Sequence, residues 1–239
     1  MKLRLQKPLA LLLAAVSCLT ALFGYRAQNV DAALQSDETV TVCEIKTGWL
    51  LDGPGERDAL LFYPGALVEP TAYAPLLRRL AEAGVDCFLV KMPLDLAVLA
   101  VNKANRVRKV YSYENWYLAG HSLGGAMAAQ YAAGHPDDLR GLFLLGAYTV
   151  KDLTRVPFPV VYIYGTEDGV VNRAKLEKGI QLSPPGTRVV ELEGGNHAQF
   201  GSYGAQKGDG TATVSAEAQQ ASAAAEILRV ILPAAAAAA

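Results

Sequence analysis

Residues 115–129 read NWYLAGHSLGGAMAA and contain the most informative motif of the chain. An apolar run, Trp116 to Ala119, ends at Gly120, and an alanine-rich run that favours a helix begins just after Gly125. Glycines two residues on either side of Ser122 remove the side chains that would clash where a strand turns at once into a helix. The pattern Gly-x-Ser-x-Gly in this context is typical of a nucleophile elbow, which holds a serine on a strained, exposed turn.

Strands alternate with helices on both sides of this motif. Apolar or alternating runs predict strands at 40–45, 48–51, 59–63, 85–90, 142–145, 160–164 and 188–192. Helical spacing or composition predicts helices at 73–83, 94–107, 126–133, 172–181 and 216–232, the last capped by Ser215. This alternation predicts the α/β fold class, with a mostly parallel central sheet covered by helices on both faces. The short connection from Leu145 to Val160 leaves no room for a cap domain.

Composition limits the classes of function. The chain has 239 residues, 22 basic and 23 acidic, and a net charge of -1, so no electrostatic signature of nucleic-acid binding is present. No group of Cys and His has zinc spacing, and we expect neither a metal nor a cofactor. Two of the three cysteines, Cys43 and Cys87, lie in the predicted domain, where they form either one disulfide or two buried free thiols.

The N-terminus predicts export. Basic residues precede an uncharged apolar run, Pro8 to Tyr25, which is typical of a secretory leader or a single membrane anchor. The small residues of 30–32 offer a cleavage site before Ala33, and residues 28–39 are polar and predict a linker. We therefore expect a leader or anchor plus linker at 1–32, a catalytic domain at 33–233 and an alanine-rich tail at 234–239. The domain is expected outside the cell, either anchored through this segment or secreted after cleavage.

A serine hydroxyl needs a base to take its proton, and the chain has only three histidines. His121 is adjacent to Ser122, and neighbouring residues on an elbow point in different directions. His135 lies at a predicted helix end. His197 follows a predicted strand, and the carboxyl ends of parallel strands form the crevice of an open α/β sheet. We therefore predict His197 as the base.

The remaining parts of the site are predicted from the loops after two other strands. The carboxylate that orients the base is predicted as Asp168, with its neighbour Glu167 as the alternative. An oxyanion needs fixed donors, and the backbone N–H of Leu123, after the nucleophile, is predicted as one of them. The N–H of Ala66 is predicted as the second, with Gly65 next. Glu69, on the same loop, either reaches the pocket or lies in water.

The motifs together resemble the α/β-hydrolases, in particular the small lidless group called dienelactone-hydrolase-like or α/β-hydrolase family 5. The resemblance runs from about Thr41 to Leu232 and is carried by the segments YPGALV at 63–68, KMPL at 91–94, GHSLGG at 120–125, YGTEDG at 164–169 and GGNHAQFG at 194–201. It implies Ser122 as nucleophile, His197 as base and Asp168 as orienting acid. Dienelactone hydrolases proper use a cysteine nucleophile, so their substrate class is not implied for a chain with Ser122.

The expected function is a serine hydrolase that transfers an acyl group to water, acting on a small ester-like molecule. The alternatives are a peptidase, thioesterase or acyltransferase with the same machinery, or a non-catalytic binding protein on the same fold. We expect no nucleic-acid partner, and contact with a membrane only through an uncleaved N-terminal segment. Loops at 66–73, 92–99 and 198–203 are expected to form the pocket walls.

Overall fold

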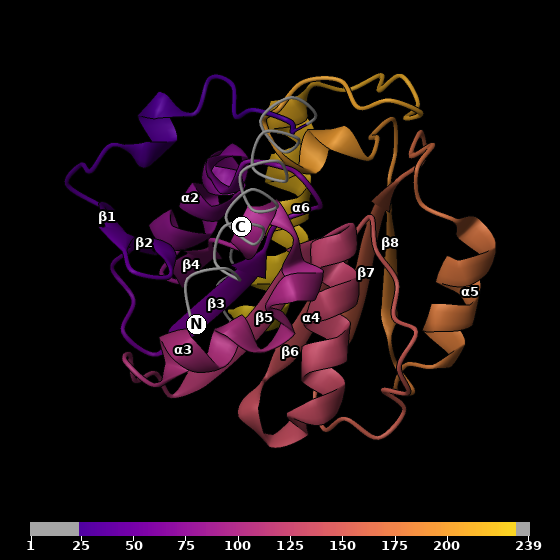
Figure 1. Ribbon diagram of the computed structural model, residues 1–239, viewed down its shortest axis with the longest axis horizontal. Helices are drawn as coiled ribbons and strands as arrows, with labels where there is room; N and C mark the ends of the chain where they lie inside the picture. Colours follow the sequence, from indigo (N-terminus) through magenta and orange to yellow (C-terminus); the bar gives the residue numbers. More distant parts are fainter. Residues whose placement is uncertain (1–23, 233–239) are drawn as a thin grey trace, which may run out of the picture.

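An eight-stranded sheet runs through the centre of the protein (Figure 1). The computed structural model describes residues 24–232. The strands are β1 Thr41–Ile45, β2 Gly48–Asp52, β3 Asp58–Tyr63, β4 Asp86–Val90, β5 Asn115–His121, β6 Gly141–Leu145, β7 Val160–Gly165 and β8 Arg188–Leu192. Their order is β1-β2-β4-β3-β5-β6-β7-β8; β2 is antiparallel to β1 and β4, and the other neighbours are parallel. The predicted mostly parallel sheet is confirmed.

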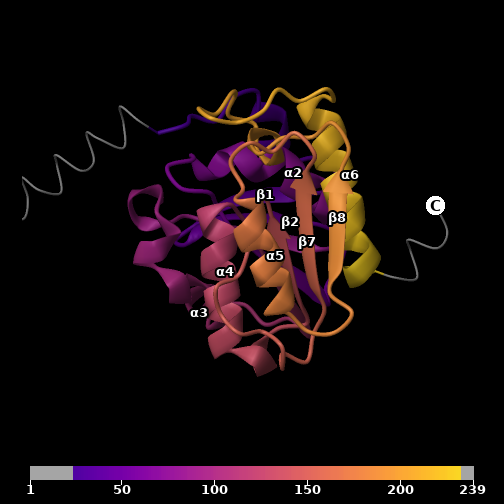
Figure 2. The ribbon, with the colours of Figure 1, turned by 90° about the vertical axis from the view of Figure 1, so that its right-hand side faces the viewer.

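Helices cover both faces of the sheet. They are α2 Ala74–Glu82, α3 Ala104–Arg108, α4 Leu123–Gly134, α5 Arg173–Gln181 and α6 Ala216–Ile231. Figure 2 shows α4 and α5 on one side of strands β7 and β8 and α6 on the other. The side chains of Asn172 and Ser215 cap α5 and α6 by accepting hydrogen bonds from Lys175 N and Ala218 N. Residues 146–159, between β6 and β7, contain no helix, and no separate cap domain is present in the described part of the chain.

The central strands are apolar on both sides because both of their faces are buried. Along β3, Leu60 and Phe62 point into the core beneath α2 and α6, whereas Leu61 and Tyr63 point into the core beneath α3, α4 and α5. All four side chains are completely buried. Side chains that alternate along the strand therefore enter two different cores, although all four are apolar. This is expected for parallel strands that lie between two layers of helices.

The helix predicted over 94–107 is confirmed only at its C-terminal end, in α3, and is wrong for residues 94–103. The chain instead forms three short 3-10 turns, Pro93–Asp95, Ala97–Leu99 and Val101–Lys103, before α3. Leu94 and Asp95 have positive φ angles of 54° and 52°, which no α-helix allows. The buried hydroxyl of Tyr63 donates to Val101 O and accepts from Ala104 N, so a side chain supplies hydrogen bonds that a helix would otherwise make.

The polar segment predicted as a linker, residues 28–39, is packed on the domain. It contains a 3-10 helix, Asp31–Leu34, and buries Val30 and Ala33. The guanidinium of Arg78, on α2, donates to Gln35 O and pairs with the Asp37 carboxylate. The polar residues of this segment therefore serve as partners for a domain side chain, which composition alone does not reveal.

The two cysteines of the domain are free thiols. Cys43 is exposed on the edge strand β1, and Cys87 is buried in β4, where its thiol donates to Val85 O. Strand β2 separates β1 from β4 in the sheet, so the two sulfur atoms do not face one another. The prediction of free thiols is therefore confirmed, but the predicted burial holds for Cys87 alone, because β1 is an edge strand.

No helix within residues 24–232 is both long and apolar enough to span a membrane. The apolar run expected as a leader or anchor, Pro8 to Tyr25, lies almost entirely outside the described residues, as does the tail at 234–239. Both expectations stay predictions.

Candidate active site

Ser122 occupies the corner between β5 and α4. Its backbone has φ 52° and ψ -124°, a conformation that a residue with a side chain rarely adopts and that costs about 1–3 kcal/mol. The turn holds because Ser122 N donates to Leu145 O at 3.0 Å and because the neighbouring backbones touch. A Cβ on Gly124 would lie 2.2 Å from the carbonyl oxygens of Tyr63 and Pro64. The glycines therefore allow the close approach that the elbow motif predicts.

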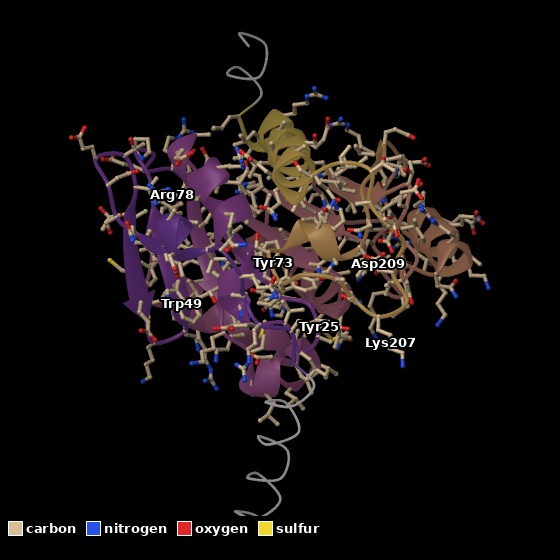
Figure 3. All side chains as sticks on the ribbon, turned by 90° about the horizontal axis from the view of Figure 1, so that it is seen from above. Tyr25, Trp49, Tyr73, Arg78, Lys207 and Asp209 are labelled. Carbon is tan, nitrogen blue, oxygen red and sulfur yellow. The ribbon has the colours of Figure 1, made fainter. Side chains whose placement is uncertain are left out.

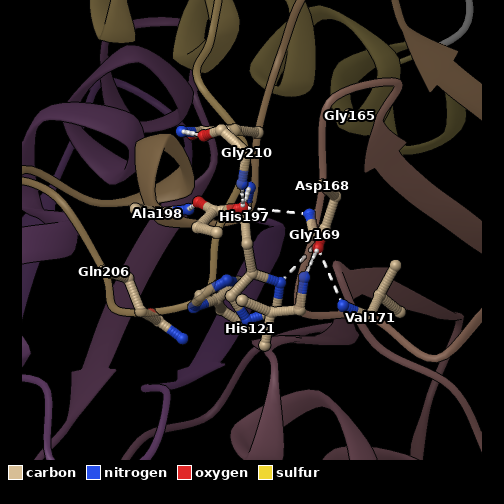
Figure 4. A network of polar contacts seen from close by, with 12 residues as sticks. His121, Gly165, Asp168, Gly169, Val171, His197, Ala198, Gln206 and Gly210 are labelled. Atoms are coloured by element: carbon tan, nitrogen blue, oxygen red, sulfur yellow. Dashed lines mark hydrogen bonds and ion pairs between the residues drawn. The ribbon is translucent and has the colours of Figure 1, made fainter.

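His197 and Asp168 form a buried pair on the loops that follow β8 and β7 (Figure 4). His197 Nδ1 lies 2.8 Å from Asp168 Oδ2. Asp168 Oδ1 accepts hydrogen bonds from the N–H groups of Val170 at 2.9 Å and Val171 at 2.8 Å, which fix the carboxylate. Glu167 is exposed, so the structure brings Asp168 and not Glu167 to the imidazole.

The second ring nitrogen of His197, Nε2, is not used by Asp168. Within residues 24–232, His197 Nε2 is buried and has no hydrogen-bond partner. A cleft of about 270 Å³ is lined by both His197 and Ser122. Its lining residues are Ser122, Leu123, Ala126, Gly146, Ala147, Tyr148, Val170, Val171 and His197. The three predicted parts Ser122, Asp168 and His197 thus meet at the carboxyl edge of the sheet.

The predicted oxyanion loop is held by a buried polar chain. Gly65 N donates to the Tyr73 hydroxyl at 3.0 Å, and that hydroxyl lies 2.8 Å from His121 Nδ1. The Gly65 N–H, which was predicted as the alternative oxyanion donor to Ala66, therefore already has an acceptor in the Tyr73 hydroxyl. Burial, with a smaller contribution from His197, holds the pKa of His121 well below its usual value, which favours a neutral ring whose Nδ1 accepts a hydrogen bond from the Tyr73 hydroxyl. His121 supports the loop that precedes Ala66, while Leu123 N lies at the start of α4.

Comparison with known proteins agrees with this geometry. Residues 59–221, more than half of the chain, match the model of the Alpha/beta hydrolase family. The chain belongs to this family. The match includes the elbow serine, the buried aspartate and the buried histidine, and the enzyme is accordingly a hydrolase. No curated protein sequence matches the chain.

Two solved structures share the fold of this α/β-hydrolase. A dienelactone hydrolase from Anabaena variabilis ATCC 29413 is 17% identical, with a TM-score of 0.59 over 81% of this chain and 100% of that one. The carboxylesterase CesB (YbfK) from Bacillus subtilis is 10% identical, with a TM-score of 0.60 over 93% of this chain and 98% of that one. At these identities the likeness establishes the fold.

The walls of the cleft in this α/β-hydrolase differ from the prediction. They come from the loops after β6 and β7, at 146–148 and 170–171, instead of from 66–73, 92–99 and 198–203. Residues of the predicted walls are buried: Tyr73, Phe200 and Tyr203 pack in the core. The N-terminal segment covers part of these loops, since Tyr25 contacts the Tyr203 ring and Gln28 N donates to Ser202 O.

Glu69 binds the N-terminal segment. Its Oε2 accepts a hydrogen bond from Ala27 N at 3.1 Å, and its own N–H donates to Tyr25 O at 2.9 Å. Tyr25 also pairs with Val68 in a parallel bridge. Neither alternative for Glu69 was right, because the residue joins the segment at 25–27 to the predicted oxyanion loop. The Tyr203 ring lies between the two segments, with its centre 5.4 Å from that of Tyr25 and 6.4 Å from that of Tyr73; both partners are labelled in Figure 3.

Gly146 is a residue of the site that sequence reasoning missed. It follows β6 with φ 51°, and a Cβ there would lie 2.9 Å from His197 Nδ1 and 3.1 Å from Asp168 Oδ2. Only a glycine therefore leaves space for the His197–Asp168 pair. The sequence offered no more than a glycine at the end of a strand, which is a common turn signal.

Asp209 is the second residue that sequence reasoning missed. Its Oδ1 accepts from Gly169 N, His197 N and Gly210 N, and its Oδ2 accepts from Ala198 N, at distances between 2.8 and 3.1 Å. One carboxylate thus joins the loop that carries Asp168 to the loop that carries His197. Asp209 is a positioning residue, since it acts through backbone groups of both loops.

Asp209→Ala is expected to lower kcat by roughly 10²-fold with little change in KM, because small displacements of catalytic groups are costly. Four N–H groups lose their acceptor, and the two loops lose their link. Steady-state kinetics with an activated ester measures the split between kcat and KM. Asp152→Ala is the matched control, because Asp152 also caps a loop, through Thr154, but is exposed and remote from the cleft. An unchanged kcat, or an equal loss in the control, would contradict the role.

Tyr73→Phe is expected to lower kcat about tenfold and to destabilise the fold by about 1–3 kcal/mol, because Gly65 N and His121 Nδ1 lose a buried partner. Turnover and denaturant unfolding measure the two effects. Tyr162→Phe removes another buried hydroxyl, bonded to Ser183 Oγ at 2.7 Å in the opposite core. This control should lose stability and retain kcat. Equal kcat losses in both variants would contradict a specific role of Tyr73 in supporting the predicted oxyanion loop.

Proposed function

We propose that the protein is a serine hydrolase that cleaves small neutral esters by acyl transfer through Ser122. The observation that carries the proposal is the shared cleft: Ser122 lines it together with His197, whose other nitrogen is held by Asp168 at 2.8 Å. His197 Nε2 lacks a partner among the described residues and is the nitrogen available to the serine hydroxyl. Hydrogen bonds between a catalytic base and the hydroxyl from which it takes a proton are often long in the free enzyme and shorten when substrate binds.

In the proposed mechanism Ser122 Oγ attacks the ester carbonyl carbon while His197 Nε2 takes the hydroxyl proton. The imidazolium that forms is stabilised by Asp168, and the carbonyl oxygen becomes an oxyanion facing the N–H groups of Leu123 and Ala66. Collapse expels the alcohol, which receives the proton from His197. Water then attacks the acyl-enzyme with His197 again as base, and the acid and free Ser122 are released.

The lining of the cleft supports small, uncharged acyl groups. The lining contains no aspartate, glutamate, lysine or arginine, and most of the wall is aliphatic. A volume of about 270 Å³ is small compared with drug-sized pockets of roughly 300–1,000 Å³. A charged acyl group would lose its hydration here without gaining a partner.

A panel of p-nitrophenyl esters, thioesters and aminoacyl amides tests the proposal against its alternatives. We expect the short-chain esters to be hydrolysed fastest, with Ser122→Ala as the blank. Preference for the thioesters or amides would favour a thioesterase or peptidase, and transfer to an added alcohol in place of water would favour an acyltransferase. Turnover equal to that of Ser122→Ala for every substrate would favour a non-catalytic binding protein.

We further propose that the catalytic domain acts outside the cell, on the basis of the basic residues and apolar run before Tyr25. The contacts of Tyr25 and Ala27 with the loop at 67–69 support a mature chain that keeps these residues, because cleavage before Ala33 would remove them. Mass spectrometry of the mature N-terminus measures this. A mature chain that begins at Ala33 and retains full activity would contradict the retention of residues 25–32, and an uncleaved chain found in the cytosol would contradict export.

A further inference from the structure

A second cleft, of about 500 Å³, lies between the turn that joins β1 to β2 and the segment that contains α3. It is lined by Ile45, Lys46, Thr47, Lys103, Arg106, Lys109, Val110 and Tyr111, and we call it the basic cleft. It shares no lining residue with the Ser122 cleft. In the view from above, Trp49 of β2 and Asp209 lie on opposite sides of Tyr73 (Figure 3). The basic cleft is therefore not part of the site already described.

The charge of the basic cleft has one sign. Four of its lining residues are cations and none is an acid. Lys91 lies close by, because its N–H donates to Thr47 O at 2.8 Å and its ammonium is 5.9 Å from the Trp49 ring centre. The net charge of the whole chain is -1, so the cationic character is local. Such a concentration creates a positive potential that attracts anions.

Among residues 24–232, the cations of the basic cleft have no side-chain partners. Elsewhere within residues 24–232 the ion pairs engage Arg57, Arg78, Arg79, Arg108, Arg188 and Arg229. No ion pair or side-chain hydrogen bond of the described residues involves Lys46, Lys103, Arg106 or Lys109. Partial burial, and then the charges of Arg106 and Lys91, lower the pKa of Lys103. The repulsion within the cleft is thus not offset by a carboxylate.

The donors in the cleft suit a phosphate group. An arginine guanidinium presents a planar fork of N–H donors that matches phosphate oxygens, and lysine ammonium groups add point charges. The hydroxyls of Thr47 and Tyr111 are additional donors in the same lining. Ile45 and Val110 provide apolar surface beside them, and Val110 is 75% exposed. The cleft therefore combines anion recognition with a place for an apolar substituent.

We propose that the basic cleft binds a phosphate-bearing ligand through Lys103, Arg106 and the neighbouring lysines, with Val110 against its apolar part. The headgroup of an anionic phospholipid and a soluble phosphate compound share this chemistry. The ligand carries at least two negative charges or is presented at high local density, because several cations converge on one space. The site is separate from ester cleavage, so its occupation does not require a functional Ser122.

Two probes of the full chain separate the sources of the phosphate. Calorimetric titration with pyrophosphate reports a soluble ligand, and co-sedimentation with phosphatidylglycerol vesicles, relative to phosphatidylcholine vesicles, reports a lipid headgroup. The comparison of the two lipids removes the apolar contribution of the N-terminal run. The basic residues Lys2, Arg4 and Lys7 are the same in every variant, so the comparison of variants removes their contribution. We expect the wild type to bind at least one anionic probe, and binding of only one identifies the source.

A pair of matched variants assigns the binding to the cleft. Lys103→Gln/Arg106→Gln should weaken binding of whichever probe the wild type binds by about tenfold or more, since each variant side chain loses a charged hydrogen bond to the phosphate. Lys175→Gln/Lys178→Gln removes the same charge from exposed positions of α5 and should change binding less than about twofold. Ester turnover should be unchanged in both variants. Failure of the wild type to bind either probe, or equal weakening in both variants, would overturn the proposal.

Discussion

His197→Ala is expected to lower kcat by roughly 10⁴- to 10⁶-fold while the protein stays folded, because a serine without its base is nearly inert. The imidazole Nδ1 of His197 lies 2.8 Å from the Asp168 carboxylate, and the backbone N–H of His197 donates a hydrogen bond to Asp209. No other histidine can replace it: His121 is buried and bonded to the Tyr73 hydroxyl, and His135 lies at the end of α4. Steady-state hydrolysis of an activated ester measures the loss.

His135→Ala is the matched control for this prediction. His135 stacks on Tyr131 at 4.1 Å and contacts Tyr131 O, away from the cleft. Its replacement should affect stability modestly and leave kcat close to that of the wild type. If His197→Ala retained more than about one hundredth of wild-type kcat, the general-base role would be lost, because positioning alone accounts for effects of that size.

Asp168→Asn is expected to lower kcat by roughly 10⁴-fold, since an amide keeps the shape of the side chain but favours the wrong tautomer of His197. The amide oxygen can still accept from Val170 N and Val171 N, so the loop should retain its conformation. The variant therefore separates the charge and tautomer role of the carboxylate from its role in folding. Burst-phase and steady-state kinetics together measure the effect.

Glu167→Gln tests the other acidic residue of the same turn. Glu167 is exposed and its carboxylate contacts only the Thr166 hydroxyl among the described residues, at 3.4 Å. Turnover should stay within about twofold of wild type, as is usual for exposed substitutions. A larger kcat loss for Glu167→Gln than for Asp168→Asn would reverse the assignment of the orienting acid.

Local patterns were sufficient to predict most of the fold. The glycines around Ser122 predicted a strand-to-helix corner because side chains at these positions would clash with neighbouring backbone. A Cβ on Gly124 would meet Tyr63 and Pro64, and a Cβ on Gly120 would meet Gly124. The order of strands and helices predicted which loops reach the carboxyl edge, and hence that Ser122, Asp168 and His197 would lie together. These inferences depend on topology, and chain order alone determines much of it in parallel sheets.

Long-range contacts were not predictable in the same way. Asp209 lies in a glycine-rich loop, and no sequence motif marks it as part of the site. Its partners are backbone N–H groups of two other loops, which any residue type can supply, so the sequence does not reveal these contacts. The helix predicted at 94–107 failed over residues 94–103 for a related reason. The Tyr63 hydroxyl, more than thirty residues away in sequence, bonds to Val101 and Ala104 and favours short turns. The pocket walls were misplaced because the segment at 25–28 covers one of the expected loops.

The central claim is that Ser122 is the nucleophile, and covalent labelling with a fluorophosphonate probe tests it most directly. The wild type should be labelled to one equivalent, with the adduct mapped by mass spectrometry to the peptide that contains Ser122. Ser122→Ala should fold, retain the His197–Asp168 pair and take up no label. Absence of label on the folded wild type, or equal labelling of Ser122→Ala, would contradict the account.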